Sequence, residues 1–186
     1  MSEVLVIHPN DPTTEFLKYI YKDKNYDIVD NDIYSLPIFE MRIILKREIM
    51  AHDKILIMGH GTPYGLLNPS PKRQSLFIID DSFAEELSKK EVVSIWCFSD
   101  QYFKRNLIYK NQFHSGMIIS EVPEAFYTIG YSPLTKEQLL ENMESFAKIV
   151  GECIEDTPEE MQKHILEKYN YKDEITQFNR KNILVF

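Results

Sequence analysis

The most constraining feature of this sequence is residues 54–65, KILIMGHGTPYG, in which a short apolar run ends in a histidine between two glycines. An apolar run of this length next to glycine is typical of a buried β-strand. Three of the chain's six glycines, Gly59, Gly61 and Gly65, lie in this stretch. Glycine permits backbone conformations and close approaches that other residues resist. We therefore expect the strand to end at a tip where the backbone and the imidazole of His60 face a common partner.

Short apolar runs recur along the chain, and helical patterns lie between them. We expect strands at residues 4–8, 26–33, 53–58, 92–96 and 117–119, and helices at 15–21, 37–50, 83–87, 102–108, 134–154 and from residue 158. Two prolines in residues 66–75 predict an exposed loop, with 76–79 as the return arm of a hairpin. Residues 182–186 form either a last strand or a docked tail. Strands that alternate with helices favour an α/β fold with a mostly parallel sheet flanked by helices.

The length of the chain favours a single domain over residues 1–186, because 186 residues can bury a sizeable core without staples. A hydrophobic content of 44% places the chain among ordinary globular proteins. We expect the sheet core within residues 1–130. Residues 131–186 carry mainly helical periodicity, so we expect the C-terminal third to be largely helical.

Charge and cysteine content narrow the classes of partner. A net charge of −8 disfavours a nucleic-acid partner, which usually needs a basic face. The two cysteines, Cys97 and Cys153, form neither a CxxC motif nor a Cys/His cluster, so we expect no disulfide framework, metal site or cofactor. The first residues lack the pattern of a signal peptide, and no apolar run is long enough to span a membrane. We expect a cytoplasmic location, where a free thiol survives.

Histidine, cysteine and serine side chains follow several of the expected strands directly. His8, His60, Cys97 and the pair 120–121 each come at the end of an apolar run. Active sites in parallel α/β sheets form beyond the carboxyl ends of the strands. His60 and Cys97 are 37 residues apart, which is long enough for a crossover to a neighbouring parallel strand. We therefore expect these two side chains to meet at one edge of the sheet.

The order of these segments resembles a known family. A strand ending in Gly-His-Gly (57–61), an apolar hairpin arm leading into an acidic helix (76–87) and a strand ending in cysteine (92–99) follow one another. This layout is similar to that of caspase-like (clan CD) cysteine peptidases, most closely the CHAT-domain proteins, over about residues 53–110. The resemblance implies a three-layer caspase-like sandwich and a cysteine endopeptidase that hydrolyses peptide bonds.

The resemblance also implies a role for individual residues. Cys97 would be the nucleophile and His60 the general acid and base. The backbone N–H groups of Gly61 and Cys97 would form the oxyanion hole. The loops that read the residue before the scissile bond hold Asp11 and Glu121 here. Two carboxylates would favour lysine or arginine in a peptide or protein substrate, and a regulatory protein partner is a further expectation.

Several structural details stay open at this point. The bulky neighbours Trp96 and Phe98 either crowd a substrate groove or pack in the core. With a preference for basic residues, Lys72-Arg73 in the exposed loop would be a candidate self-cleavage site. The alternative functions are a catalytically inactive caspase-like module that binds a protein or small ligand, and a small α/β regulatory domain unrelated to peptidases. The separation of the His60 ring from the Cys97 sulfur discriminates between them.

Each proposed site residue also has a purely structural interpretation. His60 could hydrogen-bond only its own turn, and Cys97 could be an inert buried thiol, since free cysteine is among the most buried residue types. Asp11 and Glu121 could be ordinary solvated carboxylates. The other histidines and Cys153 have no partner evident in the sequence, and we expect them to be structural.

Overall fold

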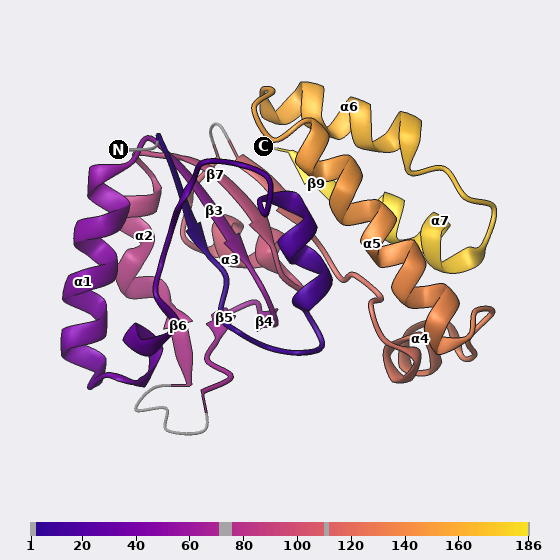
Figure 1. Ribbon diagram of the computed structural model, residues 1–186, viewed down its shortest axis with the longest axis horizontal. Helices are drawn as coiled ribbons and strands as arrows, with labels where there is room; N and C mark the ends of the chain where they lie inside the picture. The colour runs from indigo at the N-terminus through magenta and orange to yellow at the C-terminus, as the bar shows by residue number, and fades with distance from the viewer. Residues whose placement is uncertain (1–2, 71–75, 110–111, 186) are drawn as a thin grey trace.

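The computed structural model describes residues 3–70, 76–109 and 112–185 and is built around a six-stranded sheet (Figure 1). The strand order is β2-β1-β3-β7-β8-β9, and all neighbours are parallel except β8 and β9. The strands are β1 (Val4–Ile7), β2 (Asp27–Ile28), β3 (Lys54–Met58), β7 (Glu91–Ile95), β8 (Gln112–Ser115) and β9 (Ile183–Val185). The expected α/β fold with a mostly parallel sheet is confirmed, and the last segment is a strand rather than only a tail.

A small antiparallel sheet follows β3 and confirms the expected hairpin. Its strands are β4 (Gly61–Thr62), β5 (Gly65–Leu67) and β6 (Phe77–Ile79). Gly65 has a φ of 141°, and a Cβ atom there would lie 1.9 Å from the carbonyl oxygen of Ile79. Only glycine therefore fits at this turn. Lys72 and Arg73, the candidate self-cleavage site, lie outside the described residues.

Helices cover both faces of the main sheet. They are η1 (Glu15–Ile20), η2 (Asn31–Ser35), α1 (Ile38–Ala51), η3 (Asp81–Phe83), α2 (Ala84–Leu87), α3 (Ser99–Arg105), α4 (Val122–Ile129), α5 (Lys136–Glu152), α6 (Pro158–Lys168) and α7 (Glu174–Lys181). Consecutive strand residues point to opposite faces of the sheet. Leu5 and Ile7 therefore belong to one hydrophobic core with α1, α2 and α3, whereas Val4 and Val6 belong to a second core with η1, α5 and α6. Figure 1 shows α1 and α2 on one side of the sheet and α5 and α6 on the other.

The C-terminal helices begin at residues that cap them. Thr135 accepts a hydrogen bond from the Gln138 backbone, and the Gln138 side chain bonds back to Thr135, which starts α5. Thr157 and Glu160 make the same reciprocal pair at the start of α6. These caps explain why the largely helical C-terminal third, which the structure confirms, is divided into separate helices.

The expected strand at residues 117–119 is wrong. The strand next to β7 is β8, which consists of Gln112–Ser115, and Ile118 and Ile119 lie in the following loop with their side chains buried. The β8 side chains are mostly polar but buried, and each of the polar ones makes at least one hydrogen bond. Ser94 Oγ lies 2.8 Å from His114 Nδ1 in one such pair. An apolar pattern cannot reveal a strand of this kind.

The structure also differs from the expectations at one further strand and at two helices. The strand expected at 26–33 is only the two residues of β2, because Asp30 caps η2 by accepting a hydrogen bond from the Asp32 backbone. The helices α4 and α7 were not anticipated. Among the described residues, no helix is both long and apolar enough to cross a membrane.

Candidate functional site

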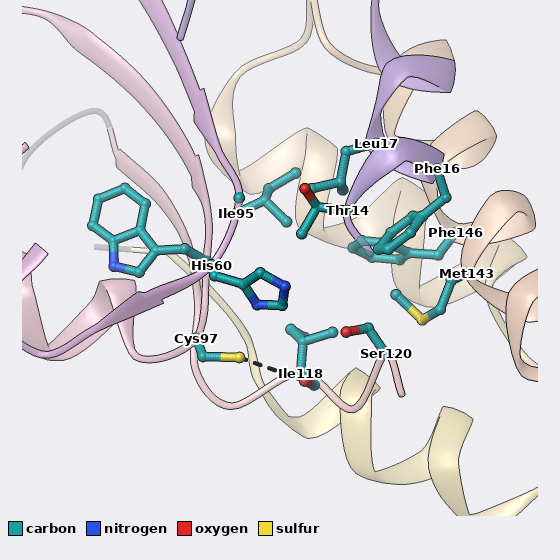
Figure 2. Close-up of a pocket in the computed structure, with 12 residues that line it drawn as sticks. Thr14, Phe16, Leu17, His60, Ile95, Cys97, Ile118, Ser120, Met143 and Phe146 are labelled. Atoms are coloured by element: carbon teal, nitrogen blue, oxygen red, sulfur yellow. Dashed lines mark hydrogen bonds between the residues drawn. The ribbon is translucent and has the colours of Figure 1, made fainter. Parts of the chain in front are cut away.

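His60 and Cys97 meet at the carboxyl ends of neighbouring parallel strands. His60 lies two residues beyond β3, and Cys97 lies two residues beyond β7. The Gly59 N–H donates to the Ile95 carbonyl over 3.1 Å, which continues the pairing of the two strands up to the site. Both His60 and Cys97 line one pocket, as Figure 2 shows. The structure thus brings the two residues together as expected.

The shared pocket is small and has apolar walls. Phe16 and Leu17 from η1 and Met143 and Phe146 from α5 line it opposite the strands. Its volume of about 20 Å³ is close to the roughly 10–15 Å³ that one water molecule requires. A pocket of this volume has room only for a small chemical group.

A hydrogen-bonded chain holds His60 on the side of β1. The Nε2 atom of His60 lies 2.6 Å from Thr13 Oγ1. The Thr13 hydroxyl donates to Asp11 Oδ1 over 2.7 Å, and the Thr13 backbone N–H donates to the same oxygen over 2.9 Å. An ionised carboxylate only accepts, so the one hydroxyl proton goes to Asp11, and Thr13 then accepts from His60 Nε2–H. This arrangement leaves Nδ1 as the ring nitrogen that can take a proton.

The Asp11 carboxyl is suited to this anchoring role. Burial alone would raise its pKa, but the hydrogen bonds from Thr13 and the nearby His60 hold the pKa of Asp11 below its ordinary value. Asp11 is therefore ionised at neutral pH. The sequence pointed to Asp11 as a substrate-binding residue, but Thr13 was not identified, because a threonine in a loop carries no pattern of its own.

Cys97 is a protonated thiol at rest. Its side chain is half-buried, and the sulfur donates to the carbonyl oxygen of Ile118 over 3.5 Å (Figure 2). Burial raises the pKa of the Cys97 thiol to about 11, and the charge of Glu124 acts in the same direction. The structure therefore holds a neutral thiol rather than a thiolate beside His60.

Trp96 packs in the core and also forms part of the wall of the pocket that contains Cys97. Its side chain is 2% exposed and belongs to the core that contains Tyr102 and Phe103. The indole lies against Gly61, where a Cβ atom would come within 2.0 Å of the ring, and its Nε1–H donates to the Thr62 carbonyl over 3.3 Å. Trp96 therefore explains why a residue without a side chain must follow His60.

Phe98 follows Cys97 in an unusual conformation. Its φ of 67° lies in the left-handed region, which non-glycine residues rarely adopt. The Phe98 N–H donates to the Gly116 carbonyl over 3.0 Å, and its side chain is half-buried. Strained backbone conformations of this kind occur more often at functional sites than elsewhere, and Phe98 lies directly beside the candidate nucleophile.

The register of the hairpin leaves the Gly61 N–H outside the pairing of β4 with β5. Leu67 N–H donates to the His60 carbonyl over 2.8 Å. Bonded and non-bonded pairs alternate along an antiparallel ladder, so the next pair, Gly61 and Leu66, is non-bonded. The Gly61 N–H therefore takes no part in the pairing with β5. The oxyanion-hole roles of Gly61 and Cys97 stay predictions.

A second, larger pocket lies next to His60 and contains Asp11. Its volume is about 210 Å³, and its other walls are the largely apolar set Pro9, Leu67, Asn68, Pro69 and Leu76. Glu121 lines neither this pocket nor the one that contains Cys97. Instead, the Glu121 side chain accepts from the Glu124 backbone N–H as the N-cap of α4. The structure thus brings Asp11, but not Glu121, to His60.

The remaining histidine near β1 and the second cysteine are packed side chains. His8 lies 2.9 Å from the Tyr21 hydroxyl, and burial lowers its pKa to about 4. Cys153 is buried at the end of α5 and donates to the Ile149 carbonyl. Over residues 3–70, 76–109 and 112–185, no group of three or more His, Cys, Asp or Glu side chains is arranged to hold a metal ion.

Comparisons with protein-family models, with curated proteins and with solved structures found no match to this chain. The fold and the site define an α/β protein with a mostly parallel sheet and with a histidine and a cysteine in one pocket at its carboxyl edge.

Proposed function

We propose that this chain is a caspase-like cysteine endopeptidase in which Cys97 and His60 form the catalytic pair. The observation that carries the proposal is their placement in one pocket at the ends of adjacent parallel strands. The hairpin and acidic helix between them occur in the order that the caspase-like resemblance requires. A sheet with one hydrophobic core on each face is compatible with the three-layer sandwich of that family.

The geometry suggests how the reaction would proceed. The Cys97 sulfur attacks the carbonyl carbon of a peptide bond while His60 Nδ1 takes the thiol proton. The carbonyl oxygen becomes an oxyanion that accepts hydrogen bonds from the Gly61 and Cys97 N–H groups. His60 then gives the proton to the leaving amine, and the C–N bond breaks to leave a thioester. Water, deprotonated by His60, hydrolyses the thioester and restores the thiol.

In this mechanism His60 acts as a general base during the attack. A thiol with a pKa of about 11 is almost fully protonated at neutral pH, so Cys97 is a thiol and not a thiolate before the substrate binds. The sulfur must also leave the Ile118 carbonyl to reach the substrate. In this mechanism, the loss of the thiol proton and the movement of the sulfur away from Ile118 therefore both follow substrate binding.

Thr13 transmits the orientation of Asp11 to His60, so its hydroxyl should matter for the rate. We expect Thr13→Val to lower kcat by roughly 10- to 100-fold with little change in KM, because the ring loses the partner that sets its tautomer. Steady-state kinetics on a fluorogenic peptide measure this. Thr13→Ser keeps the hydroxyl and should retain most of the rate. Equal rates for the valine variant and the unmodified protein would contradict the anchoring role.

Asp11 gives the second pocket a preference for basic side chains. Its carboxylate and the apolar walls suit the charged end and the methylene stem of lysine or arginine. We expect cleavage after Lys or Arg at least tenfold faster than after Leu, and Asp11→Asn should shrink this ratio by roughly tenfold. The ratio of the two cleavage rates reports only how Asp11 binds the substrate side chain. The effect of Asp11 on the position of His60 changes the cleavage of all peptides equally and leaves this ratio unchanged. Fastest cleavage after an acidic residue would overturn the preference.

The proposed activity itself is tested on a library of cellular peptides. The purified protein and its Cys97→Ala variant are incubated with the library, and new termini are identified by mass spectrometry. The proposal requires cleavages that occur only with the unmodified protein. Their absence at all pH values from about 6 to 9, with the protein folded, would overturn the peptidase proposal.

One observation favours a second candidate, an inactive module that binds a ligand in the same place. The pocket that contains Cys97 is small, and the thiol is protonated and hydrogen-bonded to Ile118. A binding module would capture a peptide with a basic side chain at the Asp11 pocket without releasing products. Binding of an uncleaved peptide, abolished by Asp11→Asn, would support this candidate.

A further inference from the structure

The loop segment 116–119, between β8 and α4, accepts one hydrogen bond from the candidate nucleophile Cys97 and one from the residue after it, Phe98. The Phe98 N–H donates to the Gly116 carbonyl over 3.0 Å, and the Cys97 sulfur donates to the Ile118 carbonyl over 3.5 Å. Segment 116–119 therefore sets both the direction of the thiol and the position of the residue that follows it.

The same segment is bound to the C-terminal end of the chain at two other points. The Gly116 N–H donates to the Asn182 carbonyl over 2.8 Å. The Asn179 side chain accepts from the Ile119 N–H over 2.8 Å and donates to the Ile119 carbonyl over 3.0 Å. Asn179 lies on α7, which Figure 1 shows beside β9. The segment is thus held between α7 and the Cys97 site.

Asn179 forms hydrogen bonds with both backbone groups of Ile119. One side-chain amide satisfies both backbone groups of a buried residue, as a neighbouring strand would. The Asn179 side chain is 1% exposed, so water cannot take its place without an opening of the fold. Gly116 is equally constrained, because a Cβ atom there would lie 2.4 Å from the Asn182 side-chain oxygen.

We propose that Asn179 is a positioning residue for Cys97: by fixing Ile119 it holds segment 116–119 over the sulfur and keeps the thiol in its resting, unreactive geometry. Its relevance to catalysis rests on the proposed peptidase function, but the restraint on the thiol does not. A movement of α7 or of segment 116–119 then releases the sulfur toward His60. The helix at the end of the chain thereby controls a nucleophile that lies far from it in the sequence.

The test is the rate at which iodoacetamide alkylates each cysteine, followed by peptide mass spectrometry from about pH 6 to 10. We expect Asn179→Leu, which keeps the branched shape but removes both hydrogen bonds to Ile119, to raise the Cys97 rate about tenfold near neutral pH. The reason is that water reaches the sulfur and the thiol pKa falls by about one unit. Cys153, buried at the end of α5, reports opening of the whole fold and should not change.

Two control variants separate this restraint from general loosening. Lys181→Ala alters an exposed residue of α7, and Ile175→Val alters a buried residue of α7 that does not line the pocket containing Cys97. Both should leave the Cys97 rate within about twofold of the unmodified protein. An unchanged Cys97 rate in folded Asn179→Leu, or a parallel rise at Cys97 and Cys153, would overturn the proposal.

A second route tests the same restraint if Asn179→Leu does not fold. Gly116→Ala pushes segment 116–119 away from Asn182 and should also raise the Cys97 rate, whereas Gly116→Ala with Asn182→Ala should restore it. Failure of this rescue would count against the proposal. Alkylation needs no peptidase activity, so a shifted Cys97 rate without any peptide cleavage would refute only the proposed function.

Discussion

Replacement of Cys97 by alanine should lower peptide cleavage by more than about a thousandfold, to the level of the buffer, and abolish labelling by a thiol-directed peptide probe. Cys97 carries the one thiol among the described residues that line the pocket, and the hydroxyl of Ser120 there is a much weaker nucleophile. The fold should survive, because the sulfur makes only one weak hydrogen bond. Cleavage assays, probe labelling and thermal unfolding measure the three effects.

The companion variant His60→Ala should lower kcat by roughly 100- to 10,000-fold, since it removes the base that takes the thiol proton. Probe labelling at Cys97 should fall as well. Cys153→Ala and His164→Ala are matched controls, because neither side chain lines the pocket. Labelling that persists unchanged in His60→Ala, or that appears at Cys153, would show that the two residues do not act together.

The pH dependence of Cys97 alkylation provides an independent check on the resting thiol. Burial raises the pKa to about 11, and the thiolate is the reactive form. The rate in the unmodified protein should therefore increase about tenfold per pH unit between about pH 7 and pH 10. A plateau below about pH 8 would indicate a thiolate that is already formed, as in a preassembled ion pair with His60.

Gly61→Ala should lower both stability and activity, because it places a methyl group 2.0 Å from the Trp96 ring. The indole is buried and hydrogen-bonded to Thr62, so it cannot swing aside freely. We expect a loss of about 1–3 kcal/mol in the free energy of unfolding, with a decrease in Tm of about 2–4 °C for each kcal/mol. Peptide cleavage should fall by at least about tenfold, since a displacement of Gly61 moves both His60 and the predicted oxyanion-hole N–H.

Two comparisons show whether the contact with Trp96 causes the loss. In a Trp96→Leu background the space is larger, so the additional cost of Gly61→Ala should be small. Gly130→Ala replaces another glycine, at a φ of 85°, where no atom lies within 4 Å of the added Cβ. It should lower stability by about 1–2 kcal/mol and leave cleavage unchanged. Equal costs of Gly61→Ala in both backgrounds would exclude the steric explanation.

The strands and helices that carry the site were predictable because their patterns are local. The apolar run at 54–58 and the run at 92–96 both became central strands of the sheet, with His60 and Cys97 just beyond their carboxyl ends. Turn residues placed the hairpin correctly between them. A strand without an apolar pattern was missed, since β8 is buried through hydrogen-bonded polar residues.

The roles of the charged residues near the site were harder to predict. Asp11 and Glu121 looked alike in the sequence, as carboxylates in loops that follow expected strands. The structure separates them, because Asp11 shares a pocket with His60 whereas Glu121 caps α4. A capping residue is recognised only when the start of its helix is known, and α4 was not anticipated.

By itself, the sequence determined that the chain forms parallel strands flanked by helices and that His60 and Cys97 follow two of these strands. Only the tertiary structure decided what holds these residues in place. Thr13 and His60 are 47 residues apart in the chain, and Asn179 and Ile119 are 60 apart. Periodicity and turn chemistry act over a few neighbouring residues, so they reveal elements but not contacts between distant loops. Those contacts depend on how the layers pack, which is where the tautomer of His60 and the resting position of the Cys97 thiol are set.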